Sequence, residues 1–142
     1  LGITTAIMTP RTVELNGEEF TTLEEFFDHF EFRALDGSFW GRNLDAFNDV
    51  LRGGFGTPVG GFRIIWRNHA LSREHLGYAE TARQLKLRLE QCHPMNTPYI
   101  QQLLHRAETR QGETVFDWLV TIIQVHGPGG QEQVDNVELV LA

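Results

Sequence analysis

Two acidic side chains, Asp45 and Asp49, stand four residues apart in a segment that reads SFWGRNLDAFNDVLRGG. On an α-helix this spacing places both carboxylates on the same face, with their Cβ atoms about 6 Å apart. Asn48 stands beside Asp49, and Arg42 and Arg52 flank the pair. Two carboxylates in this arrangement can transfer protons, bind a metal ion, form a solvated helix face, or form a binding surface for another protein.

This segment is expected to form a helix with an apolar side and a polar side. Asn43 is a suitable N-cap, because its side-chain oxygen can accept a hydrogen bond from a backbone N–H of the first turn. At about 100° per residue, Leu44, Phe47 and Leu51 fall on one side of the helix, and we predict that they are buried. The opposite side is predicted to be exposed and to consist of Asp45, Asn48, Asp49 and Arg52.

Catalysis by the two carboxylates is not favoured. General acid–base catalysis usually requires one carboxylate whose pKa is raised by burial, whereas both acids lie on the polar side of the predicted helix. No third polar group is placed to orient them, and Asp117 does not belong to a recognisable nucleophile motif. We therefore predict that the protein is not an enzyme.

The sequence contains no motif for a metal ion or a cofactor. Its six histidines are scattered, and neither HExxH nor a paired CxxC occurs. The glycine-rich segments RGGFGTPVGG and GPGG lack the Lys-Ser/Thr of a Walker loop and the strand–GxGxxG–helix context of a dinucleotide site. We predict no metal ion and no cofactor.

Negative charge is concentrated in one third of the chain. The formal net charge is −7, which argues against nucleic acid as a direct ligand. Residues 13–49 carry ten acids and two bases, so the remainder of the chain is close to neutral. An anionic surface of this kind can steer a basic partner, although a merely solvated surface gives the same composition.

Strand and helix patterns alternate along the chain. The segment TVELN resembles a short strand that ends in an Asn-Gly turn, and an amphipathic helix follows, with Thr22 and Glu25 as a capping box. After the helix that carries the acids, FRIIWRN resembles a second strand. Its adjacent residues Ile64 and Ile65 indicate a strand covered on both faces. A buried helix is predicted for the segment ETVFDWLVTIIQVHG, which is apolar nearly all round. A last strand is predicted for DNVELVLA.

These elements predict an α/β fold with a parallel sheet, because helical crossovers between strands favour parallel pairing. Two amphipathic stripes between about 76 and 111 are separated by the helix-breaking segment HPMNTP, which predicts a helical hairpin. We predict one domain over residues 1–142, with residues 1–10 as a loose leader that does not resemble a signal peptide. No apolar run is long enough for a transmembrane helix, and the single cysteine, Cys92, excludes an internal disulfide and fits a reducing cytoplasm.

The sequence resembles the barstar family of ribonuclease inhibitors. The resemblance rests on VELNGEEF, the amphipathic helix after it, FWGRNLDAFNDVLRGG and FRIIWRN, and the last helix and strand agree in order and character. It implies a three-stranded parallel sheet in the order 1-2-3, covered by helices. The hairpin at about 76–111 would then be an insertion into the family fold.

The resemblance also implies a function. Members of the family are cytoplasmic inhibitors that block a secreted ribonuclease, and the second helix with the loop before it plugs the active site of the nuclease. By position, Asp45 and Asp49 would replace substrate phosphates, and Asn48 and Arg52 would lie on the same surface. Asn48 stands where the family has a tryptophan, and Arg42 and Arg52 weaken the anionic surface. The further contact residues implied are Asn43 and Leu44 at the helix start, Phe39 as a flanking aromatic, and Gly53 for close backbone approach.

The sequence thus predicts an inhibitory immunity protein whose partner is a small basic extracellular ribonuclease or another basic protein. A second possibility is a barstar-like interaction module whose partner is not a nuclease. We predict that neither nucleic acid nor a membrane is a partner.

Overall fold

A computed structural model describes residues 11–58 and 60–142, so the predicted leader lies outside the described residues. Three parallel strands form one sheet in the order β1-β2-β3, as predicted. The strands are β1 (Arg11–Asn16), β2 (Phe62–Arg67) and β3 (Val137–Leu141).

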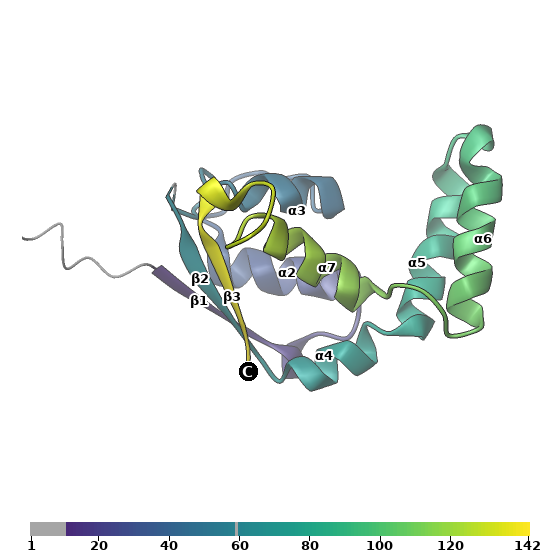
Figure 1. Cartoon of the computed structure of the whole chain (residues 1–142), viewed down its shortest axis with the longest axis horizontal. Helices are drawn as coiled ribbons and strands as arrows, with labels where there is room; N and C mark the ends of the chain where they lie inside the picture. Colours follow the sequence, from purple (N-terminus) through teal and green to yellow (C-terminus); the bar gives the residue numbers. More distant parts are fainter. Residues whose placement is uncertain (1–10, 59) are drawn as a thin grey trace, which may run out of the picture.

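Helices α2, α3 and α7 lie on the same side of the sheet, and α5 and α6 stand side by side at one end of the molecule (Figure 1). The predicted α/β fold with a helical hairpin is therefore confirmed. The α-helices are α2 (Leu23–Ala34), α3 (Leu44–Val50), α4 (His69–His75), α5 (Tyr78–Gln91), α6 (Thr97–Glu108) and α7 (Val115–Val125). The short 3-10 helices are η1 (Gly17–Glu19), η2 (Pro94–Asn96) and η3 (Gln133–Asp135). Within the described residues, no helix has the length and apolar character needed to cross a membrane.

The prediction that β2 is covered on both faces is wrong. Successive side chains of a strand point to opposite faces, and only the face that carries Ile64 is buried beneath helices. Ile65 lies on the other face and is half-buried between Arg63 and Arg67. These two arginines pair with carboxylates of the neighbouring strands, at 3.3 Å from Arg63 to Glu138 and 2.9 Å from Arg67 to a glutamate of β1. A row of ion pairs therefore occupies the open face.

The capping box predicted for α2 forms only in part. The Thr22 hydroxyl accepts a hydrogen bond from the Glu25 backbone N–H at 3.1 Å, as expected for an N-cap. The Glu25 carboxylate, however, accepts from the backbone N–H of Thr21 at 2.7 Å, one residue earlier than a capping box requires. A complete capping box is present at the start of α7, between Thr114 and Asp117.

An aromatic core anchors α3 to the rest of the fold. Phe47 of α3 is fully buried and meets Phe26 and Phe30 of α2 edge-on, with ring centroids 5.4 and 5.0 Å apart. Phe26 stacks in turn on Trp66 of β2, whose indole N–H donates to the Ser72 hydroxyl at 2.9 Å. The side of α3 that faces the core is therefore fixed against α2, which packs in turn on β2.

The hairpin has a small core of its own but is also tied to the main body. Leu85, Ile100 and Ala107 form this core, against which Trp118 of α7 also packs. At the first turn of α5, the Thr81 hydroxyl accepts a hydrogen bond from the backbone N–H of Val115 at 2.8 Å. That the hairpin is an insertion into the family fold stays a prediction.

Stability is expected to fall below pH 6.5 because of His29 on α2. Its ring is buried, and Nε2 accepts a hydrogen bond from the Asn16 backbone N–H at 3.0 Å, which requires the neutral imidazole. Burial lowers the pKa of His29 below its ordinary value of 6.5, Glu19 partly opposes this shift, and Arg33 adds to it. The unfolded chain therefore binds this proton more readily than the folded protein does. The contribution of His29 to the free energy of unfolding is fully present above pH 6.5, and the free energy of unfolding decreases as the pH falls below that value.

The measurement is urea unfolding of the wild type and of His29→Gln between about pH 5 and pH 7. Glutamine keeps an acceptor for Asn16 but cannot take up a proton. The variant should lose less stability on acidification than the wild type. Parallel pH profiles for the two proteins would show that His29 is not the responsible group.

Candidate functional site

The start of α3 is held in place by its cap and by the loop before it. Asn43 is the N-cap, and its side-chain oxygen accepts from the Ala46 backbone N–H at 2.8 Å, as predicted. In the preceding loop, Trp40 is buried and its indole N–H donates to Glu31 of α2 at 2.8 Å. Arg42 also contacts α2, through ion pairs to Asp28 and Glu31. The loop is thus fastened to α2 by two residues that follow Phe39.

Most of the predicted surface residues are exposed. Asp45, Asp49 and Arg52 are exposed on one side of the helix, and Phe39 in the preceding loop is 91% exposed. Gly53 follows the helix and is half-buried, with a φ of 99° that favours glycine.

Two expectations about burial are wrong. Phe47 and Leu51 are buried as predicted, but Leu44 is only half-buried, because it is the first residue of the helix and lies at its open end. Asn48 was expected to be exposed and is half-buried, because α7 and the residues after it pack against that side of α3. The exposed surface is therefore narrower than the sequence indicated.

The partner of Asn48 is His126, which directly follows α7. The His126 side chain is fully buried, and its Nε2 lies 2.7 Å from Oδ1 of Asn48. The other ring nitrogen, Nδ1, lies 2.7 Å from a carboxylate oxygen of Asp135. Both nitrogens thus lie within hydrogen-bond distance of a polar side chain, and His126 joins α3 to the loop between α7 and β3.

Arg52 forms a second connection to the same loop. Its guanidinium pairs with Asp49 at 2.8 Å and with Glu132 at 2.8 Å. The hydrogen bond to Glu132 is the main cause that raises the pKa of Arg52. The candidate surface therefore includes the loop at Glu132 as well as α3.

Sequence reasoning did not find His126, Glu132 and Asp135 as part of this region. No local signal identifies them, because they stand in a glycine- and glutamine-rich segment about 80 residues from α3. Their potential ligand atoms lie within 4.8 Å of one another, which is close enough for a metal ion. However, both nitrogens of the His126 ring already have a short contact, and a metal ion would have to displace one of them. We therefore interpret these three residues as a hydrogen-bond network and not as a metal site.

Arginines reduce the negative charge of the site without reversing it. Six carboxylates stand on or beside it, and within the described residues the arginines that form ion pairs with them are Arg42 and Arg52. Asp45 forms no ion pair with a basic side chain within the described part of the chain. The six carboxylates are those of Asp28, Glu31, Asp45, Asp49, Glu132 and Asp135.

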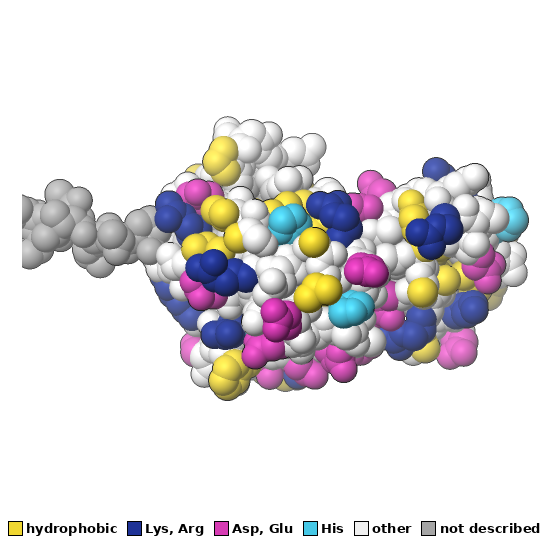
Figure 2. All heavy atoms as spheres, turned by 90° about the horizontal axis from the view of Figure 1, so that it is seen from below, with side chains coloured by type: hydrophobic (Ala, Val, Ile, Leu, Met, Phe, Trp, Pro, Cys, Tyr) yellow, Lys and Arg dark blue, Asp and Glu magenta, His cyan; other side chains and the backbone are white. Residues whose placement is uncertain are grey.

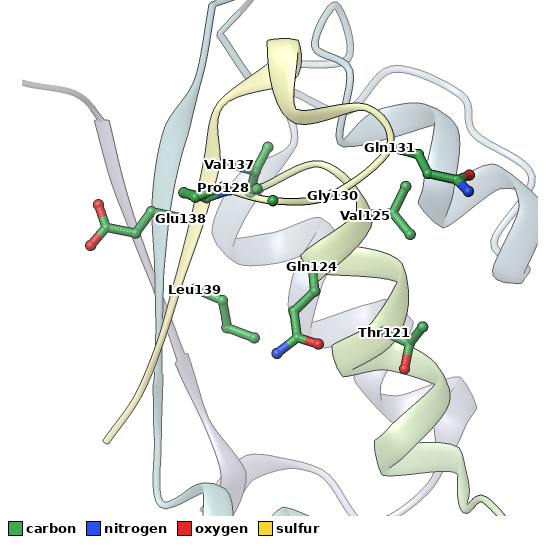
Figure 3. A pocket seen from close by; sticks show the side chains of 11 residues that line it. Thr121, Gln124, Val125, Pro128, Gly130, Gln131, Val137, Glu138 and Leu139 are labelled. Carbon is green, nitrogen blue, oxygen red and sulfur yellow. The ribbon is translucent and has the colours of Figure 1, made fainter.

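A cavity of about 730 Å³ lies between α7 and β3, next to the loop that contacts α3 (Figure 3). Gln124 of α7 and Leu139 of β3 line its two sides, and glycines of the loop close one end. No residue of α3 lines this cavity, so it is not part of the acidic surface.

Asn48→Ala is expected to destabilise the fold, because it leaves Nε2 of the buried His126 without its partner. An unsatisfied buried polar group costs about 1–3 kcal/mol, and the better helix propensity of alanine recovers about 0.5 kcal/mol of this. The measurement is the free energy of unfolding in urea.

The matched control is Asp49→Ala at the next position. Asp49 is exposed, so its replacement should change the free energy of unfolding by less than about 1 kcal/mol. Equal effects of the two substitutions would mean that the contact between Asn48 and His126 does not contribute to stability.

The structure thus defines an α/β domain that presents an acidic helix beside a three-stranded parallel sheet. The family model described as Barstar (barnase inhibitor) matches residues 10–96, which is more than half of the chain. The chain belongs to the barstar family. The match spans β1 through η2, whereas α6, α7 and β3 lie beyond it. No curated protein sequence matches the chain.

Proposed function

We propose that the protein binds and inhibits a small, basic, secreted ribonuclease. The observation that carries this proposal is the exposure of Asp45 and Asp49 on one face of α3, beside the exposed Phe39. Membership of the family described as barnase inhibitors supports the same activity. In this proposal the protein is an immunity protein of the cytoplasm and not an enzyme.

The mechanism follows from the chemistry of a ribonuclease active site, which binds substrate phosphates through cationic side chains. The two carboxylates of α3 would occupy the positions of phosphate groups, and the helix would exclude RNA from the cleft. The net charge of −7 would accelerate association with a basic partner, and this acceleration would weaken as salt is added.

Several residues would support the contact made by the acids. Phe39 would add an apolar contact at the edge of the surface, because nearly all of its ring is accessible. Asn43 and Leu44 would lie at the helix start nearest the partner, and Gly53 would allow close backbone approach after the helix. Asn48 would act through His126 and contribute less direct contact than its position in the sequence indicated.

A second candidate is an interaction module for a basic protein that is not a nuclease. The observation in its favour is the position of Arg52, which pairs with Asp49 and reduces the charge that a phosphate-like contact would use. The two candidates share the binding surface and differ only in the partner.

An inhibition assay tests the proposal. Small basic ribonucleases would be titrated with the protein, and RNA cleavage would be followed by fluorescence. The proposed function predicts stoichiometric inhibition of the cognate enzyme and competition between the protein and a nucleotide substrate analogue. Binding of a basic protein without loss of nuclease activity would favour the second candidate.

A further inference from the structure

The hairpin region has a charge opposite to that of the main body. Residues 69–112 carry six basic and four acidic side chains, whereas the chain as a whole has a net charge of −7. In the view of Figure 2 both parts carry side chains of both signs, with acidic side chains along the lower edge of the main body and several basic ones on the hairpin at the right. A region of opposite charge is not explained by a surface that binds a basic partner.

Several arginines of this region have no carboxylate partner. Elsewhere in the described part of the chain most arginines form ion pairs, but four arginines of residues 69–112 form none within 4.0 Å. Three of the four instead lie over aromatic rings: Arg73 over Phe116, Arg88 over Trp118 and Arg110 over Tyr78. The fourth is Arg106 of α6.

Two of these unpaired arginines line one cavity. The cavity has a volume of about 460 Å³ and lies where α5 and α6 meet the start of α7. Arg88 and Arg106 line it together with the rings of Tyr99 and Trp118, and the Arg88 guanidinium lies 5.2 Å from the centre of the Trp118 ring. Ligand sites are usually cavities of about 300–1,000 Å³ with an apolar lining and a few polar groups.

The lining selects for one kind of ligand. Two guanidinium groups favour a phosphate or carboxylate, because their N–H donors match the geometry of these oxygens. The single acid in the lining, Glu113, leaves a net charge of one positive unit, which suits a ligand with one anionic group. Tyr99 is exposed and Trp118 half-buried, so both present ring surface on which a planar group can stack.

We propose that this cavity binds a small planar molecule that carries one phosphate or carboxylate group. The site is separate from the acidic surface of α3, and the proposal does not depend on ribonuclease inhibition. Because the cavity is lined by α5, α6 and α7, a bound ligand would also fix the hairpin to the main body.

Titration of the full chain tests the site with four probes. Adenosine monophosphate and indole-3-acetate carry a phosphate and a carboxylate on a planar ring, whereas adenosine and inorganic phosphate each lack one of the two parts. Binding can be followed by isothermal titration calorimetry, which does not depend on the absorbance or fluorescence of the probes. Adenosine monophosphate, indole-3-acetate or both should bind more tightly than adenosine and inorganic phosphate, and the tighter of the two identifies the anionic group.

The variants Arg88→Gln and Arg106→Gln should each raise the Kd by about tenfold, equivalent to about 1.4 kcal/mol. Lys86→Gln is the matched control, because it removes one positive charge from α5 outside the cavity. It should leave the Kd unchanged, and melting curves would confirm that all three variants fold.

Three results would overturn the proposal. The first is the absence of saturable binding heat with either planar anion up to about 10 mM. The second is equal binding of inorganic phosphate and the planar anions, since the rings would then contribute nothing. The third is equal weakening by Lys86→Gln and the two arginine variants, which would indicate diffuse attraction to a basic surface.

Discussion

Replacing Asp49 with alanine is expected to weaken binding of the proposed ribonuclease partner strongly and to leave the fold almost unchanged. Loss of one partner from a buried, hydrogen-bonded charge pair at an interface generally costs about 2–5 kcal/mol. Much of this cost comes from cations of the partner that stay buried without a counter-ion. In the free protein, Asp49 is exposed and, among the described residues, its ion pair is with Arg52; such surface pairs contribute about 0–1 kcal/mol. The measurements are a binding titration and a melting curve for the same variant.

Two further substitutions on the same face serve as comparisons. Asp45→Ala should also weaken binding, but less than Asp49→Ala does. It should destabilise the fold slightly more than Asp49→Ala, because an acid in the first turn of a helix interacts favourably with the helix dipole. Arg52→Ala removes a positive charge that lies between Asp49 and Glu132. It should therefore leave binding unchanged or tighten it, with the largest gain at low salt. Normal binding by both aspartate variants would show that the face is only solvated and would remove the basis of the proposed mechanism.

The sequence predicted the buried side of α3 better than its exposed side. Burial of Phe47 and Leu51 follows from apolar spacing, and the cap by Asn43 follows from its preference for that position. The exposure of Asn48 was predicted wrongly. Helical spacing gives the direction of a side chain around the helix axis, but it does not show which other elements pack against that side of the helix. The side of α3 at Asn48 meets His126, and only the tertiary packing of α7 brings that residue there.

The sheet shows a similar limit. Its parallel order could be predicted, because crossover helices separate the strands along the chain. Whether helices cover one face of β2 or both could not be predicted. The adjacent residues Ile64 and Ile65 are compatible with either arrangement. The ion pairs that Arg63 and Arg67 form with neighbouring strands depend on register, which no local pattern in this sequence specifies.

The hairpin was predicted from its two apolar stripes, but its attachment was not. Glu80 is one of several glutamates in a polar helical segment, and nothing in its neighbours distinguishes it. In the structure its side chain is only 5% exposed. One oxygen accepts from the backbone N–H of Leu23 at the start of α2, at 2.9 Å. A residue of the hairpin thus caps a helix of the main body.

Glu80→Ala is therefore expected to be the most destabilising single substitution proposed for this protein. The Glu80 carboxylate also accepts from Arg83 at 2.7 and 2.9 Å and from Gln84 at 3.0 Å. Its loss would leave the N–H of Leu23 buried without an acceptor and remove a bidentate partner of Arg83. Breaking a buried ion pair costs about 3–5 kcal/mol, and because Arg83 is partly exposed we expect about 2–3 kcal/mol.

Urea unfolding of Glu80→Ala and of Glu90→Ala measures this effect. Glu90 is an exposed glutamate on the same helix, so its replacement should change the free energy of unfolding by less than about 0.5 kcal/mol. Glu80→Gln should fall between the two, because an amide oxygen can still accept from Leu23. If Glu80→Ala were as stable as Glu90→Ala, the first turn of α5 would not support α2. Deletion of residues 79–110 should then leave the main body folded, as expected of an appendage. If the predicted loss is observed, deletion of residues 79–110 should destabilise the start of α2, and a shorter deletion that keeps Glu80 should be tolerated better.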